Sequence, residues 1–240
     1  MDPLQISLLV GIGLAPSIFW LLFYLKKDCH PEPKSMIART FLMGVIVSPI
    51  AVILQLFFIK LNPTQAAYPD STAAFFLWAA LAEELIKFFA VKLVIFNNPE
   101  FDEPVDAMIY MVTAGLGFAA IENILVMFRT IPDGATAALG VWTLRFVGAI
   151  LLHALSSAIL GYFLAMSWFY QHHRRKLLYI GLAMATLFHF AFNAFLSSFE
   201  NQLIGLIYST SLLVAMAFLV AILFDKVRER HEAAKPVTSL

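Results

Sequence analysis

The chain has 240 residues, of which 61% are hydrophobic and only 13% are charged. A soluble domain of this length does not need such long apolar runs, so the composition excludes a soluble globular protein and predicts an integral membrane protein. Basic and acidic residues balance to a formal net charge of zero, which gives no reason to expect a nucleic-acid partner. A helix crosses the hydrocarbon layer with about 20 apolar residues, so about six to eight spans fit and no sizeable soluble domain does.

Seven apolar stretches follow one another along the chain. We predict membrane-spanning helices at 4–25, 37–60, 72–96, 106–129, 138–168, 177–198 and 203–225. The predicted fold class is all-α, a polytopic transmembrane helix bundle that forms one domain over residues 1–240. Its polar core is expected in spans three to six, at about 72–198. The fifth stretch is long for a bilayer and is expected to tilt or to project beyond it. The single cysteine, Cys29, excludes an intrachain disulfide.

Basic residues follow the odd-numbered spans in three clusters. The first cluster is Lys26, Lys27, Lys34 and Arg39, the second is Arg174, Arg175 and Lys176, and the third is Lys226, Arg228, Arg230 and Lys235. The loops on the other side, 61–71, 130–137 and 199–202, contain no lysine or arginine. The positive-inside rule therefore predicts a cell-membrane protein with its amino terminus outside and its carboxyl terminus in the cytoplasm.

Ionisable side chains occupy mid-depth positions in four consecutive spans. They are Glu83, Glu84 and Lys87 in the third, Glu122 in the fourth, Arg145 and His153 in the fifth, and His189 in the sixth. Carrying one such group into a bilayer costs roughly 2.5–3.5 kcal/mol, so several together indicate a functional use. We expect a buried polar reaction centre, with the first, second and seventh spans serving as scaffold or substrate-docking helices.

Small residues surround the two histidines at helical spacing. The fifth span has Ala149, His153, Ser157, Gly161 and Ala165 every four residues, and the sixth has Gly181, Ala185, His189, Asn193 and Ser197. Such stripes are typical of helix contacts in membranes, because small side chains let two backbones approach. Both histidines are therefore expected to face the interior of the bundle. The fourth span repeats the pattern with Gly115, Ala119 and Asn123, beside Glu122.

The depths of these groups predict two layers. At about 1.5 Å rise per residue, Glu83, His153 and His189 lie roughly 14 to 22 Å below the outer boundary, and Glu122 and Arg145 lie near about 10 Å. The deeper Glu/His layer is expected to hold a water molecule. The shallower layer is expected to be an ion pair or gate between Glu122 and Arg145.

The chemistry that this set favours is amide hydrolysis. Two adjacent carboxylates cannot both stay ionised cheaply in a low-dielectric setting unless Lys87 compensates, and such a carboxylate is suited to general base catalysis. A glutamate would take a proton from water, a histidine would orient that water, and His189 with Asn193 would donate hydrogen bonds to the oxyanion. The alternative without catalysis is a buried salt bridge to Lys87 with the histidines as interhelical hydrogen-bonding groups.

A divalent metal such as zinc is a second alternative. Its ligands would be Glu84, Glu122, His153 and His189, since two carboxylates and two imidazoles make a suitable donor set. The spacing does not favour it, because there is no HExxH helix. No cofactor is therefore predicted.

Two function classes other than hydrolysis compete with this interpretation. A proton-coupled transporter or channel also uses glutamate and histidine at mid-depth, but it would favour discontinuous helices or inverted repeats, and neither pattern is visible. A non-catalytic partner protein or a seven-helix receptor would use the buried groups as a switch, and the short outer loops give a receptor little binding surface.

Four motifs on four consecutive spans carry a family resemblance. Ala82-Glu83-Glu84-Leu85-Ile86-Lys87 resembles the EExxK signature of the PrsW family of intramembrane proteases. The segments Asp106 to Tyr110 and Gly115 to Asn123 resemble the D-x-x-x-Y and GLGFAxxEN motifs of that family. Arg145 with His153, and His189 with Asn193, complete the set, which covers roughly residues 78–196.

The resemblance implies roles for these residues. Glu83 or Glu84 would activate water, one of the histidines would assist, and His189 with Asn193 would hold the oxyanion, while Lys87, Asn123 and Arg145 would support them. The family is similar to a wider group of CAAX- and bacteriocin-processing membrane proteases, from which this chain departs by having Lys87 in place of a later arginine and Glu122 in place of a histidine. These two departures leave the division of roles between Glu122 and His153 open.

The resemblance also implies a substrate class and a chemistry. The substrates would be single-span membrane proteins, such as anti-sigma factors, that are cut near or within the bilayer. The family has been catalogued as metal-dependent, whereas the related group indicates metal-free glutamate chemistry, which we favour. The oligomeric state is not predicted.

Overall fold

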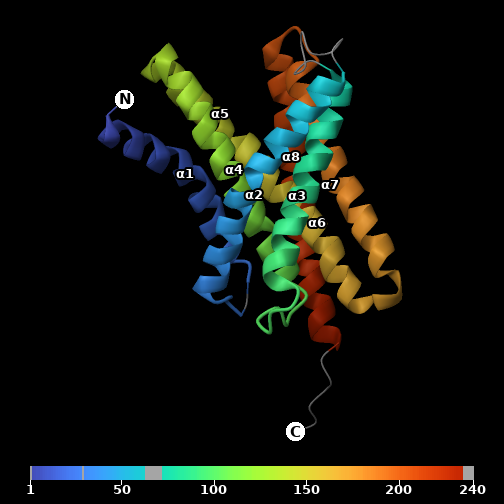
Figure 1. The fold of residues 1–240 in the computed structure, drawn as a ribbon. Helices are drawn as coiled ribbons and strands as arrows, with labels where there is room; N and C mark the ends of the chain where they lie inside the picture. Colours follow the sequence, from blue (N-terminus) through green and yellow to red (C-terminus); the bar gives the residue numbers. More distant parts are fainter. Residues whose placement is uncertain (1, 29, 63–71, 235–240) are drawn as a thin grey trace.

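A computed structural model describes residues 2–28, 30–62 and 72–234 of the chain. Cys29, Lys235 and most of the loop 61–71 lie outside these ranges. The described ranges form eight α-helices and two short 3₁₀ turns, joined by short loops. Six of the helical segments are long and apolar enough to cross a membrane, so the predicted all-α transmembrane bundle is confirmed (Figure 1).

The helices follow the predicted spans closely. They are α1 Pro3–Leu25, α2 Lys34–Leu61, α3 Ala73–Ile95, α4 Asp106–Thr130, α5 Ala135–Val147, α6 Ala149–Phe169, α7 Arg174–Ser197 and α8 Gln202–Ala234. The 3₁₀ turns are η2 Ile131–Asp133 and η3 Gln171–His173. The last helix continues well past the predicted end at 225, with a polar extension that includes Arg228 and Arg230.

Local sequence signals set several helix ends. A capping box opens α1: the Asp2 side chain accepts from the Gln5 backbone N–H, and the Gln5 side chain accepts from that of Asp2. Thr72 caps α3 by accepting from the Phe75 backbone N–H. Both arrangements satisfy N–H groups that the first turn of a helix leaves free, and this fixes where each helix begins.

The predicted fifth span is two helices. The chain breaks at Gly148, which has φ −106° and ψ −95°, between α5 and α6. The long fifth span, expected to tilt or to project beyond the bilayer, is therefore interrupted, although Ala135–Phe169 as a whole is still one segment long and apolar enough to cross a membrane. The physical reason is that a residue with these dihedral angles cannot continue the α-helical hydrogen-bond pattern, which requires φ near −63° and ψ near −42°.

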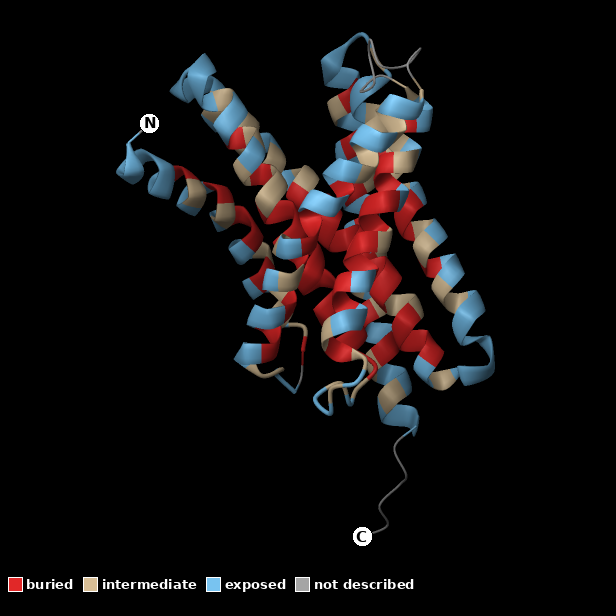
Figure 2. Cartoon of the chain, in the orientation of Figure 1, coloured by how far each residue is buried: buried red, intermediate tan, exposed pale blue. Residues whose placement is uncertain are grey.

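Helix α4 is the centre of the bundle. It packs most extensively against α6 and α2, and its residues are almost all buried as far as Ala120. Figure 2 shows buried residues concentrated in the middle of the molecule, with exposed residues on the outward faces and along α5. Many outward residues are large and apolar, for example Leu93 and Phe218. An apolar exterior around a close-packed interior is what a lipid environment requires.

Small residues allow α4 to meet its neighbours closely. A methyl group on Gly161 of α6 would lie 2.7 Å from the Cα of Met108, and one on Gly115 of α4 would lie 2.2 Å from the Ser157 hydroxyl of α6. The small-residue stripe of the predicted fifth span therefore forms the α4–α6 contact. His153 and His189 are each 2% exposed, which confirms that both face the interior.

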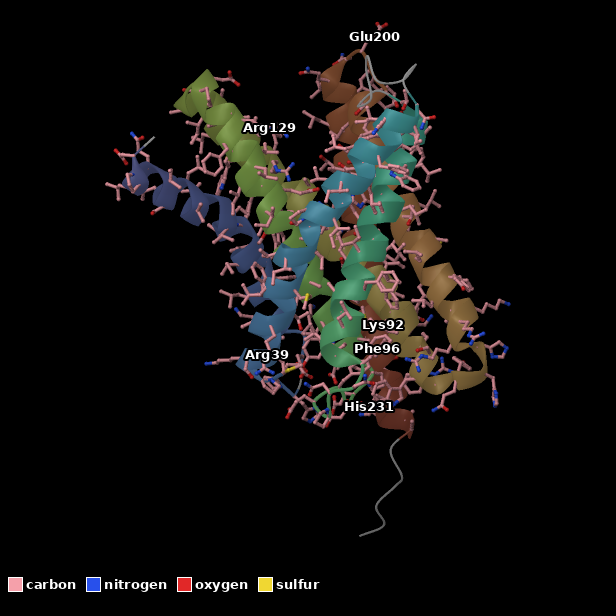
Figure 3. The ribbon with its side chains drawn as sticks, viewed as in Figure 1. Arg39, Lys92, Phe96, Arg129, Glu200 and His231 are labelled. Carbon is pink, nitrogen blue, oxygen red and sulfur yellow. The ribbon has the colours of Figure 1, made fainter. Side chains whose placement is uncertain are left out.

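The two ends of the bundle differ in charge. Figure 3 shows Arg39, Lys92 and His231 at the end where the carboxyl terminus lies, and Arg129 and Glu200 at the opposite end. The start of α1 and the end of α8 lie at opposite ends of the bundle (Figure 1).

Candidate active site in the bundle core

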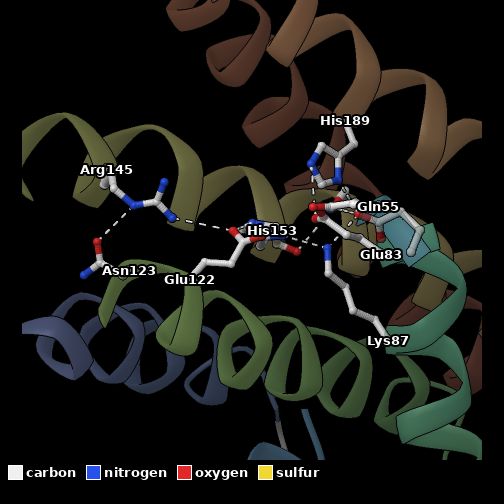
Figure 4. Close-up of polar contacts among 10 residues, drawn as sticks. Gln55, Glu83, Lys87, Glu122, Asn123, Arg145, His153 and His189 are labelled. Atoms are coloured by element: carbon white, nitrogen blue, oxygen red, sulfur yellow. Dashed lines mark hydrogen bonds and ion pairs between the residues drawn. The ribbon is translucent and has the colours of Figure 1, made fainter. Parts of the chain in front are cut away.

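The ionisable groups predicted at mid-depth come together in one buried network (Figure 4). Glu83, Glu84 and Lys87 come from α3, His153 from α6 and His189 from α7, and each is at most 5% exposed. A charged or polar group in the bilayer interior is stable only when other protein groups bond it, because no water is present there to do so. The partners that each group has therefore define what it can do.

One carboxylate oxygen of Glu84 accepts three hydrogen bonds. Its Oε1 accepts from Lys87 Nζ at 2.8 Å, from Ser156 Oγ at 2.9 Å and from His189 Nδ1 at 2.8 Å. The side chains of Glu84 and Lys87 are completely buried. Because three helices meet on this one atom, Glu84 is an anchor for the ammonium of Lys87 and for the imidazole of His189.

Lys87 determines the tautomer of His153. Its Nζ lies 2.7 Å from His153 Nδ1 and 5.1 Å from the centre of the Phe118 ring. An ammonium group only donates hydrogen bonds, so Nδ1 accepts and the proton of a neutral His153 sits on Nε2. That Nε2 lies 2.8 Å from Glu122 Oε2 and donates to it. Both ring nitrogens of His153 are thus engaged.

Glu83 and His189 form the open part of the network. His189 donates from Nδ1 to Glu84, so the Nε2 of a neutral His189 carries a lone pair, and it lies 3.6 Å from Glu83 Oε2. Glu83 Oε1 accepts from Gln55 Nε2 at 2.9 Å, whereas Oε2 is buried without a hydrogen-bond partner among the described residues. A buried acceptor without a donor is costly, so this position calls for a proton, a water molecule or a cation.

A second set of contacts joins the network to α1 and α5. Arg145 NH2 lies 3.5 Å from Glu122 Oε2, and Arg145 Nε donates to Asn123 Oδ1 at 3.0 Å. Asn123 in turn donates to the backbone carbonyl of Gly13 in α1 at 2.8 Å. The predicted ion pair between Glu122 and Arg145 is therefore present. It is not a separate layer, because Glu122 also bonds His153 directly.

The structure places the remaining predicted residues less centrally. Asn193 is partly exposed, one turn beyond His189 on α7, and no hydrogen bond of its side chain is seen in the described part of the chain. The D-x-x-x-Y motif lies at the other end of α4. There Asp106 accepts from the backbone N–H groups of Asp102 and Glu103, and the Tyr110 hydroxyl donates to Glu32. That motif ties two loops together and does not reach the histidines.

Two residues of the network were missed by the sequence analysis. Gln55, which holds Glu83, comes from α2, a helix predicted to be scaffold, although a lone amide in an apolar run was a usable signal. Ser156, which donates to Glu84, is next to the stripe residue Ser157. Nothing in the sequence separates these two serines, because only the rotation of α6 about its axis decides which hydroxyl meets Glu84.

The donor set that suits a metal ion differs from the expected one. One ligand atom each from Glu83, His153 and His189 lies within 4.8 Å of the others. Glu84 and Glu122 are outside this group, since Glu84 is bonded by three donors and Glu122 binds the Nε2 of His153. Two imidazoles and one carboxylate are the donors of one common class of catalytic zinc site, and the unpartnered oxygen of Glu83 fits a cation.

Comparison with known proteins adds the family. Residues 32–223 match the family model described as "PrsW family intramembrane metalloprotease". A protein named "Protease PrsW" from Geobacillus kaustophilus is 33% identical over 183 residues, which cover 75% of this chain and 76% of the relative. Relatives of the same name from Oceanobacillus iheyensis and Bacillus subtilis are each 31% identical, over 80% of this chain and 85% and 84% of their own lengths.

No solved structure matches the chain. The family match covers all the residues of the polar network, and the relatives cover about three quarters or more of both chains. Since the bundle, the motifs and these relatives agree, this chain belongs to the PrsW family of intramembrane proteases.

Proposed function

We propose that this protein hydrolyses peptide bonds of membrane-anchored proteins within the bilayer, with Glu83 and His189 holding the attacking water. The observation that carries the proposal is the buried, unpartnered Oε2 of Glu83, which faces His189 Nε2 at 3.6 Å. Glu84 also has one oxygen, Oε2, that is buried without a hydrogen-bond partner among the described residues, but its Oε1 is already bonded by Lys87, Ser156 and His189. Glu122 is bonded by His153. Glu83 is therefore the carboxylate best placed to accept a proton from water.

The hydrolysis follows from the contacts of each group. Glu83 takes a proton from the water while the water oxygen bonds to the scissile carbonyl carbon. The carbon–nitrogen bond then breaks, and the proton passes from Glu83 to the leaving amine. Glu84 is a positioning residue, because it orients His189 through Nδ1. Asn193, one turn further along α7, supplies an amide N–H to the oxyanion.

The same centre has donors for a divalent ion. Glu83, His153 and His189 would hold it, and a zinc ion bound there would polarise the scissile carbonyl and acidify its bound water. His153 can offer a nitrogen only by giving up its contact with Lys87 or with Glu122. This favours the metal-free form of the proposal, in which Lys87 is the permanent cation beside the carboxylates.

The test is cleavage of a panel of single-span membrane proteins by the purified protein in lipid vesicles. Glu83→Gln is expected to lower the cleavage rate by a factor of about 10² or more, the usual range for loss of a general base. Glu200→Gln is the matched control, because Glu200 is exposed at the end of the bundle, and it should cleave like the wild type. If Glu83→Gln cleaves normally, or if the folded wild type cleaves no panel member, the proposal is wrong.

Chelation separates the two forms of the chemistry. Cleavage that survives a strong chelator and disappears in Glu83→Gln supports a metal-free glutamate mechanism. Cleavage that the chelator abolishes and added zinc restores would assign an ion to Glu83, His153 and His189. Bound metal measured by elemental analysis in His189→Ala, against the wild type, checks that assignment without relying on activity.

A further inference from the structure

Helix α5 is the least buried helix of the described bundle. It is 13 residues long and none of its residues is buried. It nevertheless adjoins the polar network at Arg145. Both of its ends are glycines, Gly134 with φ +104° and Gly148 at the break to α6. Figure 1 shows α5 leaning away from the bundle axis toward the end that carries the amino terminus.

A groove lies where α5 departs from the bundle. It has a volume of about 420 Å³ and is bounded by the α5–α6 junction around Gly148, by Phe192 and Leu196 of α7, and by a face of α8 that includes Val214. We name it the α5–α8 groove. It has an open side, because Leu196 and Val214 are 39% and 51% exposed.

Among the described residues that line this groove, Arg145 is the only one with a charged side chain. Its NH2 makes no hydrogen bond to the described part of the chain and lies 3.5 Å from Glu122 Oε2, while its other terminal nitrogen points away from Glu122 in Figure 4. The guanidinium therefore has N–H groups to spare. Lipid acyl chains offer no acceptor to them, whereas a peptide carbonyl or a carboxylate does.

The groove is continuous with the polar network. Phe192 lies one turn from His189 on α7, and a methyl group on Gly148 would sit 3.6 Å from its ring. Arg145 leads through Glu122 to His153. A segment that occupies the groove therefore lies against the helix that carries His189 and against the first residue of the hydrogen-bonded chain.

A larger groove nearer the start of α5 lacks these features. It has a volume of about 660 Å³ between α1, α4 and α5, and all the residues that line it are apolar, among them Leu9, Met127 and Trp142. The indole N–H of Trp142 already donates to the backbone carbonyl of Ile12, and no residue of the polar network is among the described residues that line this groove. An acyl chain suits it.

We propose that the α5–α8 groove receives the transmembrane segment of the substrate, and that Arg145 binds a backbone carbonyl of that segment where its helix unwinds. This inference rests on the proposed function and names its entry route. Cleavage requires an extended backbone, because helical carbonyls are already hydrogen-bonded, and an unwound turn inside the bilayer needs donors. Arg145 supplies them beside the helix that carries His189.

The experiment is photocrosslinking in lipid vesicles with the Glu83→Gln protein, which binds without turnover. p-Benzoylphenylalanine is placed at Val214 or Leu196 in the groove, and at the controls Ala215 and Leu187, which are also exposed on α8 and α7 but do not line it. The probe is a synthetic single-span peptide of leucine, alanine and valine with a central Gly-Ser-Gly and a biotin tag. Crosslinking from the two groove positions is expected to exceed that from the controls several-fold.

Arg145→Gln tests the role of the guanidinium in the same assay. It should lower the crosslinking yield at Val214 several-fold while the thermal unfolding midpoint shows that the bundle is intact. Equal yields at groove and control positions, crosslinks to phospholipid alone, or no crosslinks at all would overturn the inference. Wild-type cleavage without groove crosslinks would support the proposed function and overturn the groove as the substrate site. Groove crosslinks without any wild-type cleavage would support the groove as a binding site and count against the proposed function.

Discussion

Lys87 has two partners that a charged side chain rarely combines. Its ammonium is completely buried between a carboxylate oxygen of Glu84 and an imidazole nitrogen of His153, with the face of Phe118 nearby. The first contact neutralises Glu84, and the second fixes the tautomer of His153. One side chain thus limits which atoms of the network remain available, and among the described residues Glu83 Oε2 and Glu84 Oε2 are the buried carboxylate oxygens without a hydrogen bond.

The two neighbouring glutamates should respond differently to loss of charge. Glu84→Gln removes the charged partner of Lys87 and is expected to cost about 3–5 kcal/mol of stability, as does breaking a buried ion pair. Glu83→Gln keeps an acceptor for Gln55 and should unfold near the wild-type temperature. Thermal unfolding of the three purified proteins in detergent checks this. Equal unfolding midpoints for the two variants would contradict the assignment of Glu84 as the anchor.

The adjacent serines of α6 form a matched pair. Ser156 donates to the Glu84 carboxylate, so Ser156→Ala should destabilise the protein by about 1.5–3 kcal/mol, the usual range for a hydrogen bond to a charged group. The buried hydroxyl of Ser157 has no hydrogen-bond partner in the described ranges, and Ser157→Ala should be neutral or stabilising. Denaturant titrations of both variants measure the difference, and a reversed order would exclude this rotation of α6.

The sequence could predict which residue types lie in the core but not which atoms remain free. The cost of burying Glu83, Glu84, His153 and His189 indicated a shared polar site, and the structure brings them together. It did not predict that one oxygen of Glu84 accepts three bonds, because that depends on how three helices are rotated about their axes.

At the scale of helices, the crossing of α2 and α4 is set by two glycines. A methyl group on Gly44 would lie 2.1 Å from the carbonyl oxygen of Ala114, and one on Gly117 would lie 2.1 Å from that of Phe41. Each glycine therefore meets a backbone carbonyl that cannot move aside without moving its helix. This contact brings α2 close enough for Gln55 to reach Glu83.

Gly117→Ala should separate these helices. The added methyl group is expected to cost about 1–3 kcal/mol, as overpacking does, and to weaken cleavage through displacement of Gln55. Gly140→Ala in α5 is the control, because nothing lies within 4 Å of its position, and alanine should stabilise that helix by up to about 1 kcal/mol. Unfolding midpoints of both proteins test the pair, and a Gly117→Ala protein as stable as wild type would refute the close crossing.

The loop between α1 and α2 has a titrating group of its own. Burial raises the pKa of the Glu32 carboxyl above its ordinary value, even though Tyr110 donates to it. The folded state therefore binds its proton more tightly than the unfolded state does, so Glu32 favours folding below the ordinary pKa and this contribution is lost as the pH rises through the raised pKa. Glu32→Gln should make the unfolding midpoint less dependent on pH in that window. An unchanged pH dependence would contradict this.

The sequence predicts where the helices begin and end, but it does not predict the break at Gly148 between α5 and α6. Seven apolar stretches gave the helix limits to within a few residues, apart from the polar end of α8. The interruption at Gly148 left no trace in hydropathy, because α5 and α6 are both apolar. A single glycine in a long apolar run is compatible with a continuous helix, and only its tertiary surroundings decide otherwise.

For the whole molecule, the charge asymmetry between the two ends leads to a proposed orientation. The start of α2, the start of α7 and the end of α8, which carry the basic residues around Lys34, Arg174 and Arg228, lie at the same end of the bundle (Figure 1). The positive-inside rule places that end in the cytoplasm. The α5–α8 groove then opens toward the outer half of the bilayer.

Cysteine labelling in intact cells tests this orientation. In a Cys29→Ser background, which has no other cysteine, Asp133→Cys in η2 should react with a membrane-impermeant maleimide. His172→Cys in η3 should react only after the cells are permeabilised. Both positions are exposed, so their difference reports the side of the membrane. The opposite pattern would invert the topology.

The charges of α3 also constrain how the protein is made. Glu83, Glu84 and Lys87 fall in every window long enough to cross the bilayer, and α3 is not among the six segments that are apolar enough to do so unaided. With each charge costing roughly 2.5–3.5 kcal/mol at the centre of a helix, α3 enters lipid alone less favourably than the other spans do. The partners of its charged side chains, His153, Ser156 and His189, lie on α6 and α7, which are synthesised later. Stable insertion of α3 is therefore coupled to assembly of the reaction centre.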